Sequence, residues 1–492
     1  MRWVDFKESL QDFVNEFKRE KTGMLGLALL ILLIIVAAAA PLITMPNFPE
    51  KWKDPQYWEE YPQTVPPTWY NKFTSHDLMG QVVYTSKDLQ ITRNGRTVEI
   101  KATYTLPEGY YDGPKGIIIK GFQLQKSGGT PFKPKMNIYL DRPDGKSVQL
   151  VNNKEVSSGI TVAIGRDSEI AKNVYMWLYE TTTGKTISPD EVPLSVILIQ
   201  DMVRPLFAVV DPSAYKTSGN ESVVEEIIMN PKPLHGTYTL RITIRDYPQA
   251  KVDVSNITVT FLGRVYGNMG TDYLGRDLWG AIVWGSRISL VIGITVSLLS
   301  TIIGLVYGVT SAYLGGNADE ILMRINELFS SIPSLPILIL IGATLGHIRL
   351  SLIVVLLVVF GWMGVARISR SMALQIKEQT YIEAAKALGA GTGRIVFKHI
   401  LPQLLPYAFA VIALGVPVAV ISEASLSFLG LGDPTQVTWG QILHDAQMKF
   451  AATKGYWWWV LPPGLGIALV GLTFVLIGTA LDRILNPRLR RL

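Results

Sequence analysis

Long apolar runs alternate with polar segments along the chain, and six of them have the length of a membrane-spanning helix. They cover about residues 24–43, 288–312, 329–346, 350–366, 404–421 and 461–481. About 20 apolar residues in a helix cross the ~30 Å hydrocarbon core of a bilayer. The pattern predicts a polytopic all-α membrane domain with six transmembrane helices. We interpret the first run as an uncleaved anchor rather than a signal peptide, because it follows a charged stretch and exceeds the usual apolar length.

Basic residues are concentrated in the segments on one side of the predicted spans. This side holds Arg2, Lys7, Lys18, Arg19, Lys21, Arg324, Arg367, Arg370, Lys377, Lys386, Arg394, Lys398, Arg483, Arg488, Arg490 and Arg491. The short loops of the other side hold only Arg349, Lys449 and Lys454. Because cytoplasmic loops are enriched in Lys and Arg, both termini are predicted to be cytoplasmic, with residues of about 45–287 extracellular.

The segment between the first two spans is predicted to be a separate, inserted domain. It contains short alternating runs at 91–106, 136–151, 236–246 and 252–265, separated by turn residues. Asn94-Gly95 is a type I′ hairpin signal between two such runs. Strands at this density predict an extracellular all-β, β-sandwich-like domain. The predicted organisation is therefore 1–44 (cytoplasmic N-terminus and first helix), 45–262 (β-rich insertion) and 263–492 (five further transmembrane helices).

Two glycosylation sequons, at Asn220 and Asn256, fall inside the predicted insertion. They agree with an exterior location but add little, because such tripeptides often arise by chance.

The amino-acid composition excludes several classes of function. A hydrophobic content of 48% indicates a membrane protein, and the net charge of +6 fits the loop asymmetry better than a nucleic-acid surface. The chain has no cysteine, so thiolate metal sites and cysteine nucleophiles are excluded. The five histidines are scattered without metal-ligand spacing, and no phosphate-binding loop of the G-x-x-x-x-G-K-[ST] type occurs. We expect no catalytic site and no metal site.

The most informative polar segment is the loop at 378–406, between the predicted fourth and fifth spans. Thr380 and Glu383 have the spacing of a capping box that starts a short helix, and Gly389 is placed to end it. A glycine-rich hinge then leads to a second short helix that meets Pro402. Small residues at Ala384 and Ala385 would let this helix press closely against a partner.

The loop resembles the EAA loop of ABC importer permeases, whose pattern is EAA, three residues, Gly, nine residues and then I-x-L-P. The matching residues are Glu383, Ala384, Ala385, Gly389, Leu401 and Pro402, whereas His399 replaces the isoleucine of the pattern. The resemblance assigns these six matching residues to coupling with an ATPase.

Other stretches are similar to the C-type permease of dipeptide and oligopeptide importers. They are GTDYLGRDLWG (from 270), the run into a proline-broken third span (312–340), EASLSFLGLG (from 423) and LDRILNPRLR (from 481). The resemblance implies the type I ABC importer permease fold and a function in peptide import across the cell membrane.

The resemblance also implies partners: a B-type permease in a heterodimer, an extracellular substrate-binding protein and two cytoplasmic ATPase subunits. These ATPase subunits would bind ATP and Mg, so this chain would hold no cofactor and hydrolyse nothing. Oligosaccharides or another solute are the alternative cargo. The alternative hypothesis from a different functional class is a membrane-anchored surface-binding protein, but this hypothesis does not explain the EAA loop.

Three further residues are candidates for the transport pathway or its gate. Pro333 and Pro336 are predicted to break the third span, and broken helices in transporters commonly line cavities. Glu423 is an ionisable residue near the outer end of the fifth span, and such residues are functional candidates by default. Gly304 and Gly308 are interpreted as a helix-packing face.

Members of this family usually join their first two spans by a few tens of residues, so the β-rich insertion is a departure. The sequence allows three roles for this insertion: docking of the binding protein, a vestibule above the pore, or a simple spacer.

Overall fold

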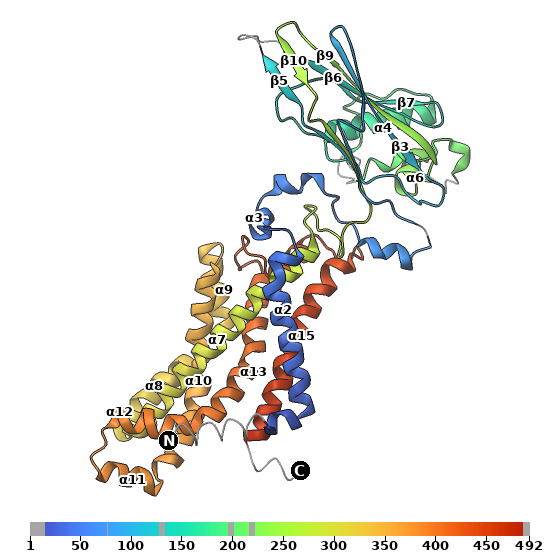
Figure 1. The fold of residues 1–492 in the computed structure, drawn as a ribbon. Helices are drawn as coiled ribbons and strands as arrows, with labels where there is room; N and C mark the ends of the chain where they lie inside the picture. The colour runs from blue at the N-terminus through green and yellow to red at the C-terminus, as the bar shows by residue number, and fades with distance from the viewer. Residues whose placement is uncertain (1–14, 76, 127–132, 195–200, 216–221, 486–492) are drawn as a thin grey trace. The chain divides into compact units, whose positions relative to one another are not determined.

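The computed structural model describes residues 15–75, 77–126, 133–194, 201–215 and 222–485. The chain divides into two compact units (Figure 1). One is helical and combines Met1–Asp54 with Leu278–Leu492, and the other covers Pro55–Asp277. The sequence placed the insertion at 45–262, so the second unit begins and ends later than that range. The sequon at Asn220 and the basic residues Arg2, Lys7, Arg488, Arg490 and Arg491 lie outside the described residues.

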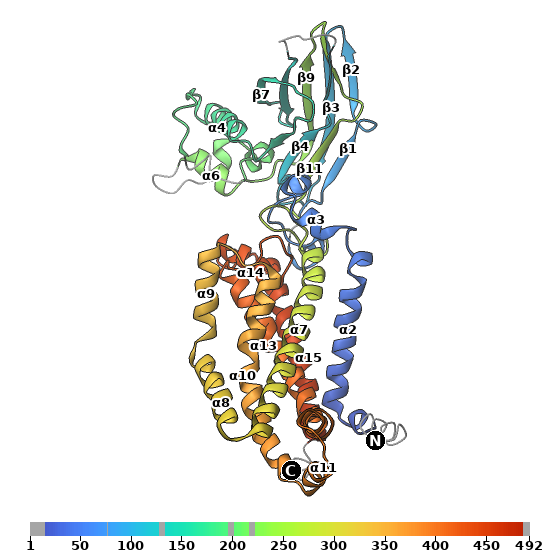
Figure 2. The same cartoon turned by 90° about the vertical axis from the view of Figure 1, so that its left-hand side faces the viewer.

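The helical unit is built mainly from long apolar helices that pack side by side (Figure 2). Its elements are α2 (Lys21–Ile43), α3 (Phe48–Trp52), α7 (Leu278–Leu314), α8 (Gly316–Ser331), α9 (Ser334–Leu345), α10 (Leu350–Lys377), α11 (Thr380–Ala387), α12 (Thr392–Ile395), the π-helical turn η5 (Val396–Ile400), α13 (Leu401–Phe428), α14 (Trp439–Met448) and α15 (Trp457–Leu485).

Within the described residues, 5 helices are long and apolar enough to cross a membrane. They are α2, α7, α10, α15 and the continuous helix Thr392–Phe428 formed by α12, η5 and α13. Helices α8 and α9 pass the same test only as a pair, and they are bent by 64°. The predicted third span at 329–346 thus corresponds to the end of α8 and all of α9. These helices support a multi-pass membrane protein.

Helices α7 and α10 pack closely through the predicted small-residue face. A Cβ added to Gly304 would lie 2.6 Å from the carbonyl oxygen of Trp362, and one added to Gly308 would lie 2.2 Å from that of Ala366. Ser369 Oγ donates to the carbonyl of Gly304 at 3.1 Å across the same contact. Any larger side chain at these two glycines would separate the helices, which confirms the packing interpretation.

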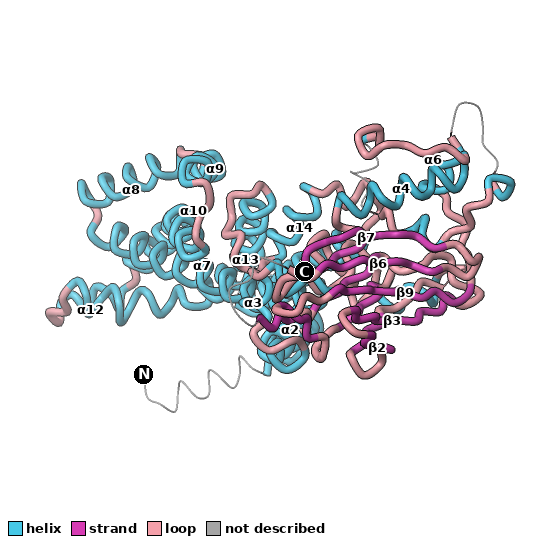
Figure 3. Tube along the Cα trace, turned by 90° about the horizontal axis from the view of Figure 1, so that it is seen from above, coloured by secondary structure: helices cyan, strands magenta, loops and turns pink. Residues whose placement is uncertain are grey.

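The described residues of the second unit form three antiparallel sheets. The five-stranded sheet has the order β2-β3-β9-β6-β7 (Figure 3), the four-stranded sheet β1-β11-β4-β8, and a two-stranded ribbon β10-β5. The strands are β1 (Val82–Thr85), β2 (Gln90–Asn94), β3 (Thr97–Leu106), β4 (Gly116–Lys120), β5 (Gln123–Lys126), β6 (Lys135–Asp141), β7 (Ser147–Glu155), β8 (Val162–Ile164), β9 (Gly236–Arg245), β10 (Ala250–Asp253) and β11 (Thr258–Leu262). All four predicted alternating runs form strands.

The hairpin between β2 and β3 differs from its predicted turn type. Asn94 pairs with Thr97, so the two loop residues are Gly95 and Arg96. Gly95 has φ +61°, whereas Arg96 is not among the residues with positive φ. Positive φ at the first loop position alone is the signature of a type II′ turn, so the predicted type I′ turn is wrong. The hairpin itself is as predicted.

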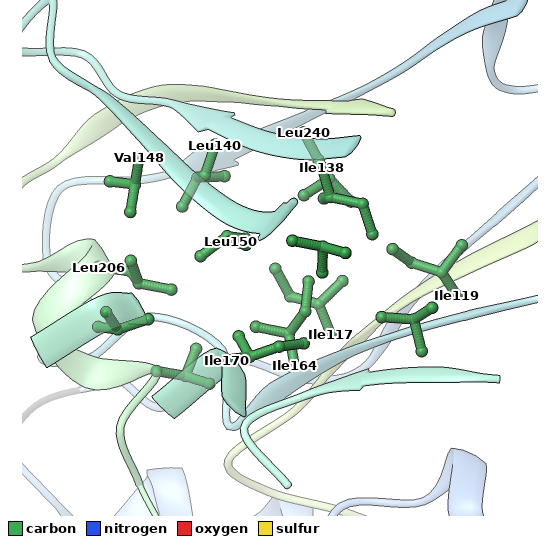
Figure 4. Packing of buried hydrophobic residues seen from close by; sticks show 14 of the residues in the cluster. Ile117, Ile119, Ile138, Leu140, Val148, Leu150, Ile164, Ile170, Leu206 and Leu240 are labelled. Carbon is green, nitrogen blue, oxygen red and sulfur yellow. The ribbon is translucent and has the colours of Figure 1, made fainter. Parts of the chain in front are cut away.

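A single apolar core joins the two larger sheets of this unit (Figure 4). Ile117 and Ile119 of β4 and Ile138 and Leu140 of β6 are buried in the same cluster. Along β3 the side chains alternate between buried and exposed, which is the pattern of a strand with one face on a core. The two sheets thus pack as expected of a sandwich.

The all-β prediction is wrong, because the unit also contains helices α4 (Ser168–Thr183) and α6 (Val223–Met229). Helix α4 buries Ile170, Val174 and Leu178, which recur every four residues and so lie on one face. Asp167 caps its first turn and Gly184 ends it in the left-handed conformation. Ile170 of α4 contributes to the same core as the sheets.

Candidate functional site

The loop at 378–406 forms a bent helical projection, which we call the knob and define as α11, α12 and the residues between them. The knob is fixed to the ends of the membrane helices by apolar side chains. Ile382 of α11 and Ile395 of α12 are buried in one cluster with Leu305 and Val309 of α7 and Ala373 of α10. A rigid attachment of this kind allows a force on the knob to reach three spanning helices.

The start of α11 differs from the predicted capping box. Gln379 is the N-cap, Thr380 is the first helical residue, and no side-chain hydrogen bond caps the helix. Glu383 therefore does not close a capping box. Its side chain is exposed, so it is available to a partner.

The end of α11 is a complete Schellman motif, with Gly389 where the sequence placed it. Gly389 has φ +81°, and its N–H donates to the carbonyl of Lys386. The N–H of Ala390 donates to the carbonyl of Ala385 at 3.0 Å. An added Cβ at Gly389 would meet nothing within 4 Å, so glycine is required by the backbone conformation rather than by space.

The outward face of α11 carries small and apolar residues. Ala384 and Gly389 are exposed, Ala385 is half-buried, and the side chain of Leu388 is 89% exposed. Ala384 lies one helical turn before Leu388, so the two residues belong to one exposed face.

Leu401 and Pro402 lie at the start of α13, beyond the π-helical turn. Leu401 is half-buried and Pro402 is exposed. Proline has no N–H to donate within the helix, and the preceding residues adopt the π form, with the N–H of Leu401 donating to the carbonyl of Val396. The second predicted helix of the loop therefore continues into a spanning helix.

Sequence reasoning missed an ion pair that ties α8 to α10. Arg370 donates to Asp319 from Nε at 2.7 Å and from Nη2 at 2.5 Å, and Ser311 of α7 also donates to Asp319. Asp319 is buried, so the pair fixes three helices near the knob. The available signal was the acidic residue Asp319 in the first turn of α8, but its partner lies 51 positions away.

A cavity of about 340 Å³ lies between α7, α9, α10 and α13. Pro333 is the N-cap of α9 and marks the break with α8, whereas Pro336 lies in the first turn of α9, where its missing N–H is tolerated. Ser334 and Leu335, between the two prolines, line this cavity. The residues between the two prolines thus form part of one wall of the cavity. The break between α8 and α9 occurs at Pro333.

Glu423 lies beside this cavity but does not line it. Its side chain is 1% exposed, and Ser427 Oγ donates to its Oε1 at 2.7 Å, one turn along α13. The neighbouring Ser422 faces the cavity. A Cβ on Gly440 of α14 would lie 2.7 Å from Ser427 Cβ, so α14 packs closely on this part of α13.

No group of three or more His, Cys, Asp or Glu with the arrangement of a metal site occurs within the described ranges.

Comparison with known proteins places the chain in a family. Residues 300–491 match the binding-protein-dependent transport system inner membrane component, and residues 9–67 match the N-terminal transmembrane domain of oligopeptide transport permease C. The chain is 40% identical over 223 residues to the dipeptide transport system permease protein DppC of Bacillus subtilis, covering 45% of this chain and 69% of that protein.

Two oligopeptide transport system permease proteins are also similar. The protein OppC of Bacillus subtilis is 38% identical over 223 residues, covering 45% of this chain and 72% of its own length. OppC of Haemophilus influenzae is 36% identical over 224 residues, covering 45% and 71%. Among solved structures, the inward-facing MetNI methionine ABC transporter aligns with TM-score 0.34 and 25% identity, covering 42% of this chain and 95% of that chain. The chain belongs to the family of binding-protein-dependent transport system inner membrane components.

Proposed function

We propose that this chain is a permease subunit of a type I ABC importer that carries dipeptides or oligopeptides into the cell. We count the pair α8 and α9 as one broken span, which gives six spans and both termini on the same side of the membrane. The enrichment of Lys and Arg on that side supports a cytoplasmic location for it. The unit Pro55–Asp277 is then extracellular. The relatives named as dipeptide and oligopeptide permeases support the choice of cargo.

The mechanism we propose couples ATP hydrolysis by partner subunits to movement of the spanning helices. Two cytoplasmic ATPase subunits bind ATP and Mg, and one of them receives the knob of this chain. A B-type permease supplies the other half of the pathway, and a binding protein delivers the peptide from outside. This chain contributes no catalytic group to the reaction.

The main observation that supports the coupling proposal is that one side of the knob is buried and the other side is exposed to solvent. Ile382 and Ile395 fix it to α7 and α10, whereas Ala384 and Leu388 face away from the chain. Closure of the ATPase subunits would therefore pull on the inner ends of α7, α10 and α13 together. The cavity between these helices would change shape in response.

An uptake assay with membrane vesicles tests this function. The vesicles contain the complete complex with internal ATP, and they are supplied with the binding protein and a radiolabelled dipeptide, pentapeptide or trisaccharide. We expect ATP-dependent accumulation of the peptides and none of the trisaccharide. Accumulation of the trisaccharide alone would assign the importer to a different cargo, and no ATP-dependent uptake of any solute would contradict import itself.

A further inference from the structure

A second pocket, of about 450 Å³, lies between α8 and α10, and its lining is strongly polar. The two helices pack side by side (Figure 2). Six charged side chains line the pocket, three acidic and three basic, and its other lining residues are uncharged. The charged residues are Asp319, Glu320, Glu327, Arg324, Arg367 and Arg370. Because these charges balance, the pocket favours neither a purely anionic nor a purely cationic ligand.

Two ion pairs compensate four of the six charges. One is the bidentate pair of Asp319 with Arg370, and the other joins Arg324 to Glu327 at 3.0 Å. The remaining residues, Arg367 and Glu320, are exposed, and neither forms an ion pair within the part of the chain that the structure describes. The pocket therefore offers one positive and one negative side chain to a ligand.

The pocket lies where the apolar runs of the chain end. The apolar run of α10 stops at Ala366, directly before Arg367, and the next run of the preceding helices begins at Phe329, two residues after Glu327. Charged side chains at the ends of spanning helices reach the polar region of a bilayer. The charged lining is thus at the level of the lipid headgroups.

Exposed apolar side chains lie beside this polar lining. Ile321, Ile325 and Leu328 recur at intervals of four and three residues along α8, so they form one stripe, and all three are exposed. Ile368 of α10 follows Arg367 and is exposed as well. A ligand with a charged head and apolar chains would cover both kinds of surface at once.

The two uncompensated charges select the kind of headgroup. Phosphate oxygens accept hydrogen bonds from a guanidinium group, often two at once. A primary ammonium group donates hydrogen bonds to a carboxylate. Phosphatidylethanolamine carries both groups on one headgroup, whereas phosphatidylglycerol has no ammonium group. Phosphatidylcholine keeps the positive charge but has no N–H to donate.

We propose that the pocket between α8 and α10 binds the headgroup of phosphatidylethanolamine, with the phosphate on Arg367 and the ammonium group on Glu320. The acyl chains then lie on the exposed apolar side chains of the two helices. The bound lipid joins α8 to α10 beside the pair of Asp319 and Arg370. This site requires a chain embedded in a membrane, and it depends on neither the cargo nor the orientation of the termini.

Photo-crosslinking with a lipid probe tests the site. The chain is extracted in detergent together with the subunits that co-purify, and the probe is phosphatidylethanolamine with a diazirine in one acyl chain. Digestion and mass spectrometry locate the adducts, which we expect within α8 and near Ile368. Unlabelled phosphatidylethanolamine should compete about 5-fold better than phosphatidylglycerol or phosphatidylcholine with the same acyl chains.

Two substitutions separate the roles of the two charges. Arg367→Gln removes the phosphate contact, so half-maximal labelling should need about 5-fold more probe. Glu320→Gln removes only the ammonium contact, so phosphatidylethanolamine and phosphatidylglycerol should compete equally. Both residues are exposed, so neither substitution disturbs a core. Arg349→Gln is the matched control and should leave labelling unchanged, because Arg349 is exposed at the other end of α10 and does not line the pocket.

Three results would overturn the proposal. Absence of adducts from α8 and from the segment around Ile368 would show that lipid does not reach the pocket, as expected if another protein covers it. Equal competition by the three lipids in the unaltered chain would show that the headgroup is not recognised. Labelling that is unchanged in both Arg367→Gln and Glu320→Gln would assign the adducts to the apolar stripe alone.

Discussion

Replacing Ala384 by phenylalanine should strongly reduce ATP-driven uptake while leaving the chain inserted in the membrane. The side chain of Ala384 is exposed on α11, so the substitution disturbs no core. In the proposed complex a partner covers this position, and overpacking a close contact costs about 1–3 kcal/mol. That corresponds to roughly 5- to 150-fold weaker association. Co-purification of the ATPase subunits and uptake by vesicles measure the effect.

Gln375→Phe is the matched control for this variant. Gln375 is also exposed, and it lies on α10, outside the knob. We expect it to retain ATPase association and uptake. Normal uptake in Ala384→Phe, or equal losses in both variants, would show that the knob is not the coupling surface.

The second large effect is expected in the unit Pro55–Asp277, on replacing Arg264 by alanine. Arg264 is buried and pairs with Asp201 at 2.8 Å and with Asp112 at 3.7 Å, and Lys115 also pairs with Asp201 at 3.1 Å. Its Nε donates to the carbonyl of Gly113 at 2.7 Å. Removing it leaves the buried Asp112 and the partly buried Asp201 with less compensating charge, and breaking a buried ion pair costs about 3–5 kcal/mol.

Pulse proteolysis of the full-length chain measures this loss of unfolding free energy, because the amount of the protected fragment that contains the unit Pro55–Asp277 reports how much of the unit is folded. Arg241→Ala is the control, because Arg241 pairs with Asp141 at 3.0 Å on the surface and both side chains are partly exposed. An exposed pair contributes about 0–1 kcal/mol. Equal stability of the two variants would contradict the structural role of the buried pair.

The difference between the unaltered chain and Arg264→Ala should depend on pH. Burial alone would raise the pKa of Asp201, but the charges of Arg264 and Lys115 outweigh it and hold that pKa below its ordinary value. A lowered pKa in the folded state contributes stability above the unfolded value of about 3.9, and this contribution is lost as pH falls through the folded value. We therefore expect the difference to be largest near neutral pH and to shrink in acid.

The spanning helices were predictable because their signal is local and strong. Runs of apolar residues give the positions of α2, α7, α10, α13 and α15, although most of these helices extend beyond the runs. Helix α8 was missed because Asp319, Arg324 and Glu327 lower its apolar character. Only the partner from α10 explains how Asp319 is accommodated, and that partner is distant in the sequence.

Within the unit Pro55–Asp277, the strands were predictable from the sequence, and the helix α4 was predictable as well. Its apolar residues repeat every four positions between a capping Asp167 and a terminal Gly184. The density of turn signals around it favours strands, whereas the four-residue period of its apolar residues is a helical signal. The turn type at Gly95 required the register of the two strands, which the dipeptide alone does not give.

In the candidate site, too, features set by local sequence were predictable, whereas features that depend on distant residues were not. Gly389 ends its helix as predicted, because the requirement for positive φ is local. The pocket between α8 and α10 was not predictable, since two helices line it and its free charges depend on which side chains pair. Whether the six residues of the EAA pattern contact an ATPase subunit stays a prediction.

Cross-linking from a single cysteine at position 388 tests the coupling surface most directly. The chain contains no native cysteine, so Leu388→Cys carries a unique site for a thiol-specific photo-crosslinker. Leu388 is 89% exposed on the knob, and Leu465→Cys provides a control at an exposed position of the spanning helix α15. We predict an adduct between position 388 and an ATPase subunit in the assembled complex, and none from position 465. Absence of that adduct while the ATPase subunits still co-purify would contradict the account.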